Sequence, residues 1–304
     1  MIDLDCMSDS ATTLAAMAES LAKSGDYRVL RRLVPRTEFA QSDGQAVKSG
    51  ILLDVETTGL DPVRDEVIEL AMVKFDYRPD GTIVRVSDAF TAFQEPSKPI
   101  PREIVDLTGI TDETVAGHHI DEAAVAAFAE DAVIVIAHNA NFDRKFAERY
   151  WSLFQHKAWG CSATEVDWRK QGFDGSRLGY LLAGAGFFHH AHRAIDDCHA
   201  LLEILALELP TLGKTALAAL LERARKRTMR IWAEQSPFEL KDELKRRGYR
   251  WCDGSEGRLK SWYIDVDEDQ QAAEIDFLRT TIYLREVEPR VQALSAMSRF
   301  SVRA

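Results

Sequence analysis

The sequence contains few cysteines, and no two of them are close together. Four occur among 304 residues, without a CxxC pair. A zinc site or a disulfide framework needs cysteines at short, defined spacings, so the sequence favours neither and is typical of a reducing compartment. A cytoplasmic protein is therefore expected. The four cysteines are Cys6, Cys161, Cys198 and Cys252.

Long apolar runs are missing as well. No stretch approaches the roughly 18–20 apolar residues that a membrane-spanning helix needs. The start of the chain, MIDLDCMSDS, lacks the basic and then apolar layout of a signal peptide. We expect no membrane association. Because 46% of the residues are hydrophobic, the chain can bury enough apolar surface to fold, which excludes a disordered or fibrous protein.

The sequence also lacks the excess of basic residues that most nucleic-acid-binding proteins carry. Its 38 Lys and Arg stand against 49 Asp and Glu, a net charge of −11. The deficit is confined to the middle of the chain. Residues 49–219 contain 27 acidic and 15 basic side chains, whereas residues 220–304 contain 15 acidic and 17 basic ones. The overall charge therefore does not exclude a nucleic-acid substrate.

Residues 1–48 predict a helical N-terminal extension that serves for packing or docking. Apolar residues recur at helical spacing on both sides of Gly25, which predicts two short helices with a stop between them. These residues are Leu14, Met17 and Leu21 before the glycine, and Val29, Leu30 and Leu33 after it.

Residues 49–214 alternate between strand and helix patterns. Three antiparallel strands are expected within residues 51–92, the last two joined by a hairpin through Asp80 and Gly81. A further strand is expected at residues 132–138. Strands followed by alternating helices and strand predict an α/β fold with a mixed sheet covered by helices on both faces. The expected helices are 121–130, 141–154, 176–186 and 194–209.

Residues 215–304 predict a small α+β C-terminal domain. A helix is expected over 216–234, a hairpin carrying Trp251 and Trp262 over 249–266, and a closing helix, or helix and strand, over 270–287. Arg and Lys clusters beside aromatic side chains fit a track for a single nucleic-acid strand. Alternatively, they are a solvated helix face and a hairpin core.

Acidic residues that suit metal binding occur in three separate segments. Asp54 and Glu56 follow an apolar run, and alternation along a strand puts them on one side, where they repel each other unless a cation binds. Asp143 lies in the first turn of an expected helix, after His138 and Asn139. Each segment also has an ordinary interpretation, a solvated strand edge or an acid at a helix start.

The third segment, HRAIDD, opens another expected helix. His192 precedes Asp197 by five residues, so its imidazole can lean over the site that Asp197 enters. We interpret the remaining histidines nearby as solvated or packing residues. They are His189, His190 and His199.

Taken together, the three segments resemble the DEDDh-type, or DnaQ-like, 3′-5′ exonucleases, the family of the proofreading epsilon subunit of bacterial DNA polymerase III. LLDVETTGLDP is similar to its first motif, HNANFD to its second and HRAIDD to its third, and IPREIVDLTGIT is similar to a segment beside the active site. The resemblance covers residues 49–210. It implies an RNase H-like fold with a mixed five-stranded sheet flanked by helices.

The resemblance also implies a set of site residues. Asp54, Glu56, Asp143 and Asp197 would hold two divalent cations, Mg²⁺ or Mn²⁺, and His192 would be the general base. Leu107 and Phe142 could equally be core residues. The residues implied to bind the terminal nucleotide are Thr57, Thr58, Leu60, Leu107, Asn139 and Phe142.

The expected activity is metal-dependent hydrolysis from the 3′ end of DNA, at single-stranded or mispaired ends, with release of nucleoside 5′-monophosphates. An exoribonuclease of the same family is the alternative, because the choice of sugar depends on the pocket around the 2′ position. A nucleic-acid-binding scaffold without catalysis is a remote third reading. No polymerase partner is expected, since the chain does not end in the flexible tether of the proofreading subunit, and a homo-oligomer remains open.

Overall fold

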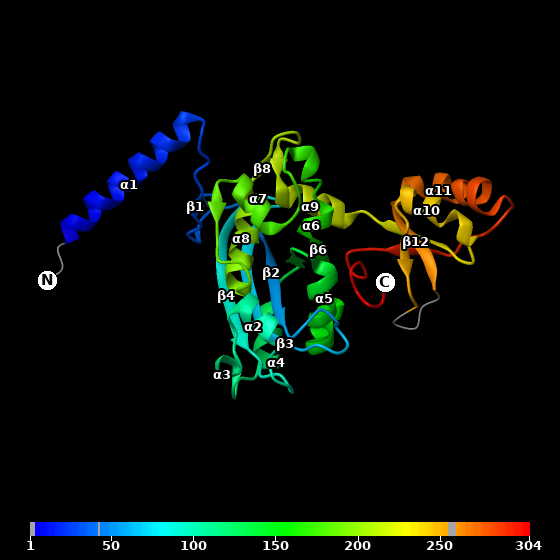
Figure 1. The fold of residues 1–304 in the computed structure, drawn as a ribbon, viewed down its shortest axis with the longest axis horizontal. Coiled ribbons are helices and arrows are strands. Elements are labelled where there is room, and N and C mark those ends of the chain that lie inside the picture. Colours follow the sequence, from blue (N-terminus) through cyan, green and yellow to red (C-terminus); the bar gives the residue numbers. More distant parts are fainter. Residues whose placement is uncertain (1–3, 42, 255–259) are drawn as a thin grey trace.

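The computed structural model describes residues 4–41, 43–254 and 260–304. It has three parts: an N-terminal helix that extends away from the body, a central sheet with helices on both faces, and a C-terminal lobe with its own sheet (Figure 1). No helix in the described part of the chain is both long enough and apolar enough to cross a membrane.

The central sheet has five strands in the order β4-β3-β2-β5-β6. The strands β2, β3 and β4 are antiparallel, while β5 and β6 run parallel to β2. This arrangement confirms the mixed sheet and the hairpin at Gly81, whose φ of 88° a glycine adopts without strain. The fifth strand, β6, is too short for the sequence pattern to reveal. The bounds are β2 Lys48–Thr57, β3 Val67–Tyr77, β4 Ile83–Phe93, β5 Ile134–Ala137 and β6 Trp159–Cys161.

Alternation along β2 builds a hydrophobic core on each face of the sheet. Leu52 packs with the helices α7 (Leu178–Gly184), α8 (Ala194–Ala206) and α9 (Ala216–Arg225). Ile51 and Leu53 point the other way and pack with residues of α4 (Glu122–Ala129) and α5 (Ala140–Tyr150). The predicted helical cover on both faces is confirmed.

The helix expected over residues 216–234 is wrong in its second half. Helix α9 ends at Arg225, and β10 (Thr228–Ala233) follows it. Pairing of β10 with β12 and β13 outweighs the helical pattern of the sequence. Helix α9 packs in the core of the central sheet. Its Ala218 lies so close to Gly81 that a Cβ atom added to Gly81 would be 2.5 Å from the Ala218 Cα. The sequence prediction placed the domain boundary at residue 215 and so assigned this helix to the C-terminal domain.

The C-terminal lobe is a four-stranded antiparallel sheet in the order β11-β12-β10-β13. Helices α10 (Lys241–Arg247) and α11 (Gln271–Phe277) lie over one face of it (Figure 1). The expected hairpin is confirmed, with Trp251 opposite Trp262, although its residues 255–259 lie outside the described part. The closing segment is a helix, a π-helical turn and a strand. The remaining strands are β11 Arg250–Cys252, β12 Ser261–Asp267 and β13 Val291–Leu294.

The N-terminal extension contains one long helix, α1 (Leu4–Ser24). The second expected helix is wrong, because Arg31–Arg32 form the strand β1 and pair in parallel with β7 (Phe187–Phe188). Hydrogen bonds to Gly186 and Phe188 hold this segment extended, and Leu33 packs on the central core. Three apolar side chains of α1 are exposed. They are Leu14, Met17 and Leu21.

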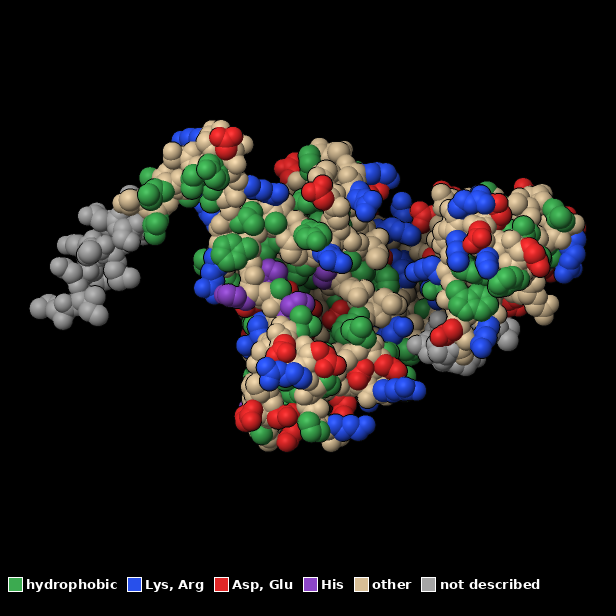
Figure 2. Space-filling view, in the orientation of Figure 1, with side chains coloured by type: hydrophobic (Ala, Val, Ile, Leu, Met, Phe, Trp, Pro, Cys, Tyr) green, Lys and Arg blue, Asp and Glu red, His purple; other side chains and the backbone are tan. Residues whose placement is uncertain are grey.

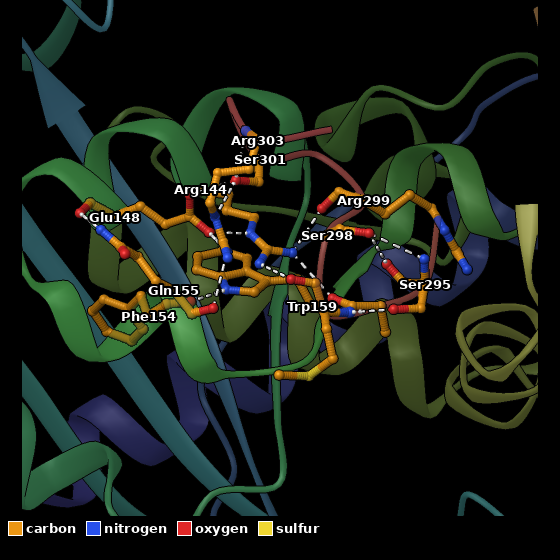
Figure 3. A network of polar contacts seen from close by, with 12 residues as sticks. Arg144, Glu148, Phe154, Gln155, Trp159, Ser295, Ser298, Arg299, Ser301 and Arg303 are labelled. Carbon is orange, nitrogen blue, oxygen red and sulfur yellow. Dashed lines mark hydrogen bonds and ion pairs between the residues drawn. The ribbon is translucent and has the colours of Figure 1, made fainter. Parts of the chain in front are cut away.

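The last residues of the chain return from the C-terminal lobe to α5 (Figure 3). Arg144 of α5 is fully buried and donates hydrogen bonds to the carbonyl oxygens of Ala296, Met297 and Arg299 at 3.0, 2.7 and 2.7 Å. The two lobes are thus joined by two chain segments, α9 to β10 and the tail 295–304. Shorter elements are α2 Arg102–Thr108, α3 Asp112–Val115, α6 Ser162–Glu165, β8 Glu208–Leu209, β9 Lys214–Thr215 and 3₁₀ turns at Ser152–His156, Arg169–Gln171, Phe238–Leu240 and Glu268–Gln270.

Candidate active site

Three of the predicted acids meet at β2, the middle strand of the central sheet. Asp54 and Glu56 project from the same side of β2, and Asp197 reaches them from the first turn of α8, which packs along β2 and β3. One carboxylate oxygen from each residue lies within 4.8 Å of the other two. Oxygen ligands at this spacing suit a hard divalent cation such as Mg²⁺ or Mn²⁺.

The fourth predicted acid, Asp143, lies beside β2 in the first turn of α5. It is only 3% exposed, and its Oδ1 accepts a hydrogen bond of 3.3 Å from the backbone N of Val55. Val55 stands between Asp54 and Glu56, so this bond holds Asp143 next to the acidic pair. The sequence placed these four residues in three distant segments, and the fold brings them together.

The electrostatics of the cluster favour a bound cation. Burial, followed by the charge of Asp143, raises the pKa of Asp54 well above its ordinary range. Burial and the charge of Asp197 raise the pKa of Glu56 to about 8. Burial raises the pKa of Asp143 to about 7. Carboxylates that resist ionisation together are stabilised when a divalent cation neutralises them, so the donor set fits the metal that the motifs imply.

A fifth acid, Glu69, belongs to the site and was missed by the motif reading. It lies on β3 directly opposite Glu56 and is fully buried. Its carboxylate accepts hydrogen bonds of 3.3 Å from the Arg193 side chain and from the backbone N of Ala194, which begins α8. Glu69 therefore fixes the start of the helix that carries Asp197. An acid in the middle of the apolar run VIELAMV was the available signal.

His189 and His192 contact Asp197 in different ways. The side chain of His189 is 7% exposed, and its Nε2 lies 2.8 Å from Asp197 Oδ1, so its interpretation as a solvated or packing residue is wrong. His192 is exposed. Its backbone N donates to Asp197 Oδ2 at 2.8 Å, and its φ of 66° is a left-handed value that this bond helps to hold.

The residues predicted to bind the terminal nucleotide surround the cluster in different ways. The Thr57 hydroxyl donates to the Gly59 carbonyl at 2.6 Å, and Thr58 Oγ1 accepts from the Glu66 backbone N at 2.9 Å, so both side chains shape the turn after β2. Leu60 is 83% exposed.

Three further predicted nucleotide-binding residues lie on helices or helix starts. Leu107 on α2 is 51% exposed, so it is not a core residue. Phe142 packs on the core with its ring 4.9 Å from that of Phe146, as the alternative reading expected. Asn139 is exposed at the start of α5. Its role and those of Leu60 and Leu107 stay predictions.

A mixed five-stranded sheet with clustered carboxylates at the edge of β2 defines a metal-binding enzyme domain of the RNase H-like class. Residues 51–205, just over half of the chain, match the family model described as RNase_T, exonuclease. The chain belongs to this family of DnaQ-like 3′-5′ exonucleases, and family membership places it among the phosphodiester hydrolases.

Relatives agree with this placement. The chain is 30% identical over 205 residues to the PolC-type DNA polymerase III of Thermotoga maritima. This match covers 62% of this chain and 14% of that protein. The chain is also 29% identical over 223 residues to the PolC-type DNA polymerase III of Caldanaerobacter subterraneus. This match covers 68% of this chain and 15% of that protein. The chain thus spans about one seventh of the length of these relatives.

One solved structure supports the fold, and a second is reported as similar. An E. coli exonuclease I complex with single-stranded DNA, in a zinc-bound form, has a TM-score of 0.50 at 13% identity and covers 83% of this chain and 66% of that one. Exonuclease X in complex with 5′ overhanging duplex DNA is 23% identical, with a TM-score of 0.41, covering 57% of this chain and 98% of that one.

Proposed function

We propose that this protein is a metal-dependent 3′-5′ exonuclease that hydrolyses DNA from single-stranded or mispaired 3′ ends and releases nucleoside 5′-monophosphates. The observation that carries the proposal is the convergence of Asp54, Glu56 and Asp197 within 4.8 Å, with Asp143 held beside them by the Val55 N–H. A group of acids this dense repels a phosphate unless cations are bound, so the cluster fits a metal-assisted reaction on a phosphodiester.

Asp54, Glu56 and Asp197 would hold one divalent cation, Mg²⁺ or Mn²⁺, and Asp54 with Asp143 would hold a second. When bound, such ions lower the pKa of a water and neutralise charge on the departing 3′ oxygen. The protein itself contributes the orientation of its carboxylates. Glu69 fixes the start of α8, and the Val55 N–H fixes the Asp143 carboxylate.

His192 is the proposed general base. It lies on the loop immediately before α8, and its backbone is fixed to Asp197 while its side chain stays exposed to an incoming water. An imidazole side chain is a suitable proton acceptor at neutral pH. His189 has a different role, because its ring contacts the Asp197 carboxylate and holds it in place.

The test is nucleotide release from a 3′-labelled DNA oligonucleotide with Mg²⁺ or Mn²⁺ present. Wild-type protein should release mononucleotides, and Asp54→Ala should not. Asp88→Ala is the matched control, because Asp88 is an exposed aspartate on β4 of the same sheet. The proposal fails if wild type and Asp54→Ala release equal amounts, or if Asp88→Ala loses activity to the same extent as Asp54→Ala.

A further inference from the structure

A second feature of the protein is a cleft between the central domain and the C-terminal lobe. Its volume is about 440 Å³, and residues of α5, β6, α6 and α9 form one side, while β10, β11, β12 and the tail form the other. Lys and Arg side chains gather where the two lobes meet (Figure 2). None of the three sequence motifs accounts for this cleft as a whole.

The lining of the cleft is basic in a protein that is otherwise acidic. Five basic side chains face two acidic ones, Glu165 and Asp265. An excess of positive charge between lobes, in a chain of net charge −11, indicates an anionic ligand. The basic residues are Lys145, Arg223, Arg230, Arg250 and Arg299.

The ion pairs within the cleft leave some of this charge uncompensated. Arg230 binds Asp265 through two hydrogen bonds of 2.7 and 3.0 Å, and Arg250 also donates to the same carboxylate at 2.6 Å. These two guanidinium groups share one acid, so the group keeps a positive charge. The Arg250 side chain is 58% exposed and can meet a ligand from solvent.

The cleft also offers an aromatic ring. Tyr263 lines it, with the guanidinium groups of Arg230 and Arg250 at 4.6 and 4.8 Å from its ring centre. Arg299 lines the cleft as well, but it is 6% exposed and pairs with Glu165. Cationic and aromatic groups together are the usual surface for a single nucleic-acid strand.

The cleft reaches the start of α5, the helix that carries Asp143. Asn139 and Asn141 line the cleft, and both belong to the segment that leads into α5 and Asp143. The opposite wall is fixed to the same helix, because the tail residues Arg299 and Ser301 are bonded to Arg144 and Glu148 of α5. The two walls of the cleft are therefore held together at α5.

We propose that this cleft binds the sugar-phosphate backbone of the substrate strand on the 5′ side of the terminal nucleotide. The inference rests on the proposed exonuclease function, and it assigns the C-terminal lobe a role in holding long substrates. Phosphates of the strand meet Lys145 and Arg250, while the 3′ end enters the carboxylate cluster past Asn139. A dinucleotide is too short to reach these residues.

The test is a double variant, Lys145→Gln with Arg250→Gln, in the full-length protein. Asp265 keeps Arg230 as a partner, so no buried acid is left alone. On a single strand of about 15 nucleotides, near the upper site size of such surfaces, KM should rise several-fold. The slope of log KM against log salt should fall by about 1.4, or about 0.7 for each lost phosphate contact. Kinetics on a dinucleotide should not change.

The matched control is Arg246→Gln with Arg285→Gln, which removes the same charge from exposed positions of the C-terminal lobe outside the cleft. This control should leave KM and its salt slope unchanged, and Arg250→Lys should retain wild-type affinity. The proposal is overturned if the cleft variant leaves KM for the long strand unchanged, or raises KM equally for the dinucleotide.

A binding measurement distinguishes failure of the cleft proposal from failure of the proposed exonuclease function. Fluorescence anisotropy of a labelled strand, measured with chelator present, reports binding without catalysis. If wild type hydrolyses nothing but the cleft variant alone weakens this binding, the exonuclease proposal fails and the cleft stands. If wild type hydrolyses both substrates and the cleft variant binds as wild type does, only the cleft proposal fails.

Discussion

Asp143 and Arg144 are consecutive residues of α5 that connect the carboxylate cluster with the C-terminal tail. Asp143 accepts a hydrogen bond from Val55 in the middle of the sheet, whereas Arg144 donates three hydrogen bonds to backbone carbonyls of residues 296–299. Both side chains are buried. The helix that positions a proposed metal ligand is therefore itself held by the last residues of the chain.

Arg144→Ala should destabilise the protein strongly. Arg144 pairs with Glu148 at 2.7 Å, and the two side chains are 0% and 4% exposed. Removing one partner of a buried pair costs about 3–5 kcal/mol. Arg102→Ala is the matched control, because Arg102 and Asp106 form the same i,i+4 pair at 2.8 Å on the surface, where such pairs contribute only about 0.3–0.5 kcal/mol. Urea denaturation measures both, and similar losses in the two variants would contradict the role given to Arg144.

Metal binding should stabilise the folded protein through the carboxylate cluster. At a Mn²⁺ concentration about 100 times Kd, the free energy of unfolding should rise by about 2.7 kcal/mol. In Asp54→Asn the gain should be much smaller, since one ligand is lost. Asp88→Asn, on the exposed part of β4, should behave as wild type. Thermal melts with chelator and with Mn²⁺ provide the measurement, and an equal gain in Asp54→Asn would place the metal elsewhere.

The metal-free protein should lose stability as pH rises from about 5 to about 8. The folded-state pKa of Glu56 is raised from 4.5 to about 8, and that of Asp143 to about 7. Between these values and the ordinary ones, the folded state holds protons that the unfolded state has released, so unfolding becomes easier as pH increases. Glu56→Gln should flatten this slope. Saturating Mg²⁺ should flatten the slope as well. Denaturation curves at about pH 5, 6, 7 and 8, which span the ordinary and the raised pKa values, test both expectations.

His192→Ala and His189→Ala should fail in different ways. Loss of a general base lowers kcat by about 10²–10⁴-fold, and excess metal should not rescue His192→Ala. Loss of a residue that orients a metal ligand weakens metal affinity by about 10–100-fold, so His189→Ala should recover activity at high Mn²⁺. His190→Ala, exposed on the same loop, is the control. Metal titrations of initial rates decide, and rescue of His192→Ala by metal would contradict its role as base.

DNA should be degraded faster than RNA of the same sequence. Matched single-stranded oligonucleotides, digested under identical metal concentrations, give the ratio of kcat/KM. Faster trimming of RNA would reverse the assignment and favour the exoribonuclease alternative, because the pocket around the 2′ position decides the choice of sugar.

The grouping of the acids and the class of fold could be predicted from the sequence because their signals are local. Motif residues lie at fixed spacings beside strand ends and helix starts, and the alternation of β2 and the Asp-Gly hairpin depend on near neighbours in the chain. The predictions that failed also depended on local patterns, which tertiary contacts outweighed. Residues 29–33 have helical spacing, but Arg31 and Arg32 among them pair with β7, and residues 228–233 leave the predicted helix to join a sheet.

By itself the sequence determined the exonuclease motifs, the mixed sheet and the location of the negative charge. Only the tertiary structure decided that Glu69 lies opposite Glu56, that His189 contacts Asp197, and that the tail is fixed by Arg144. It also placed basic residues of both lobes around one cleft. The physical reason is distance along the chain: each of these contacts depends on strand register or burial that brings separate segments together, and no short pattern encodes it.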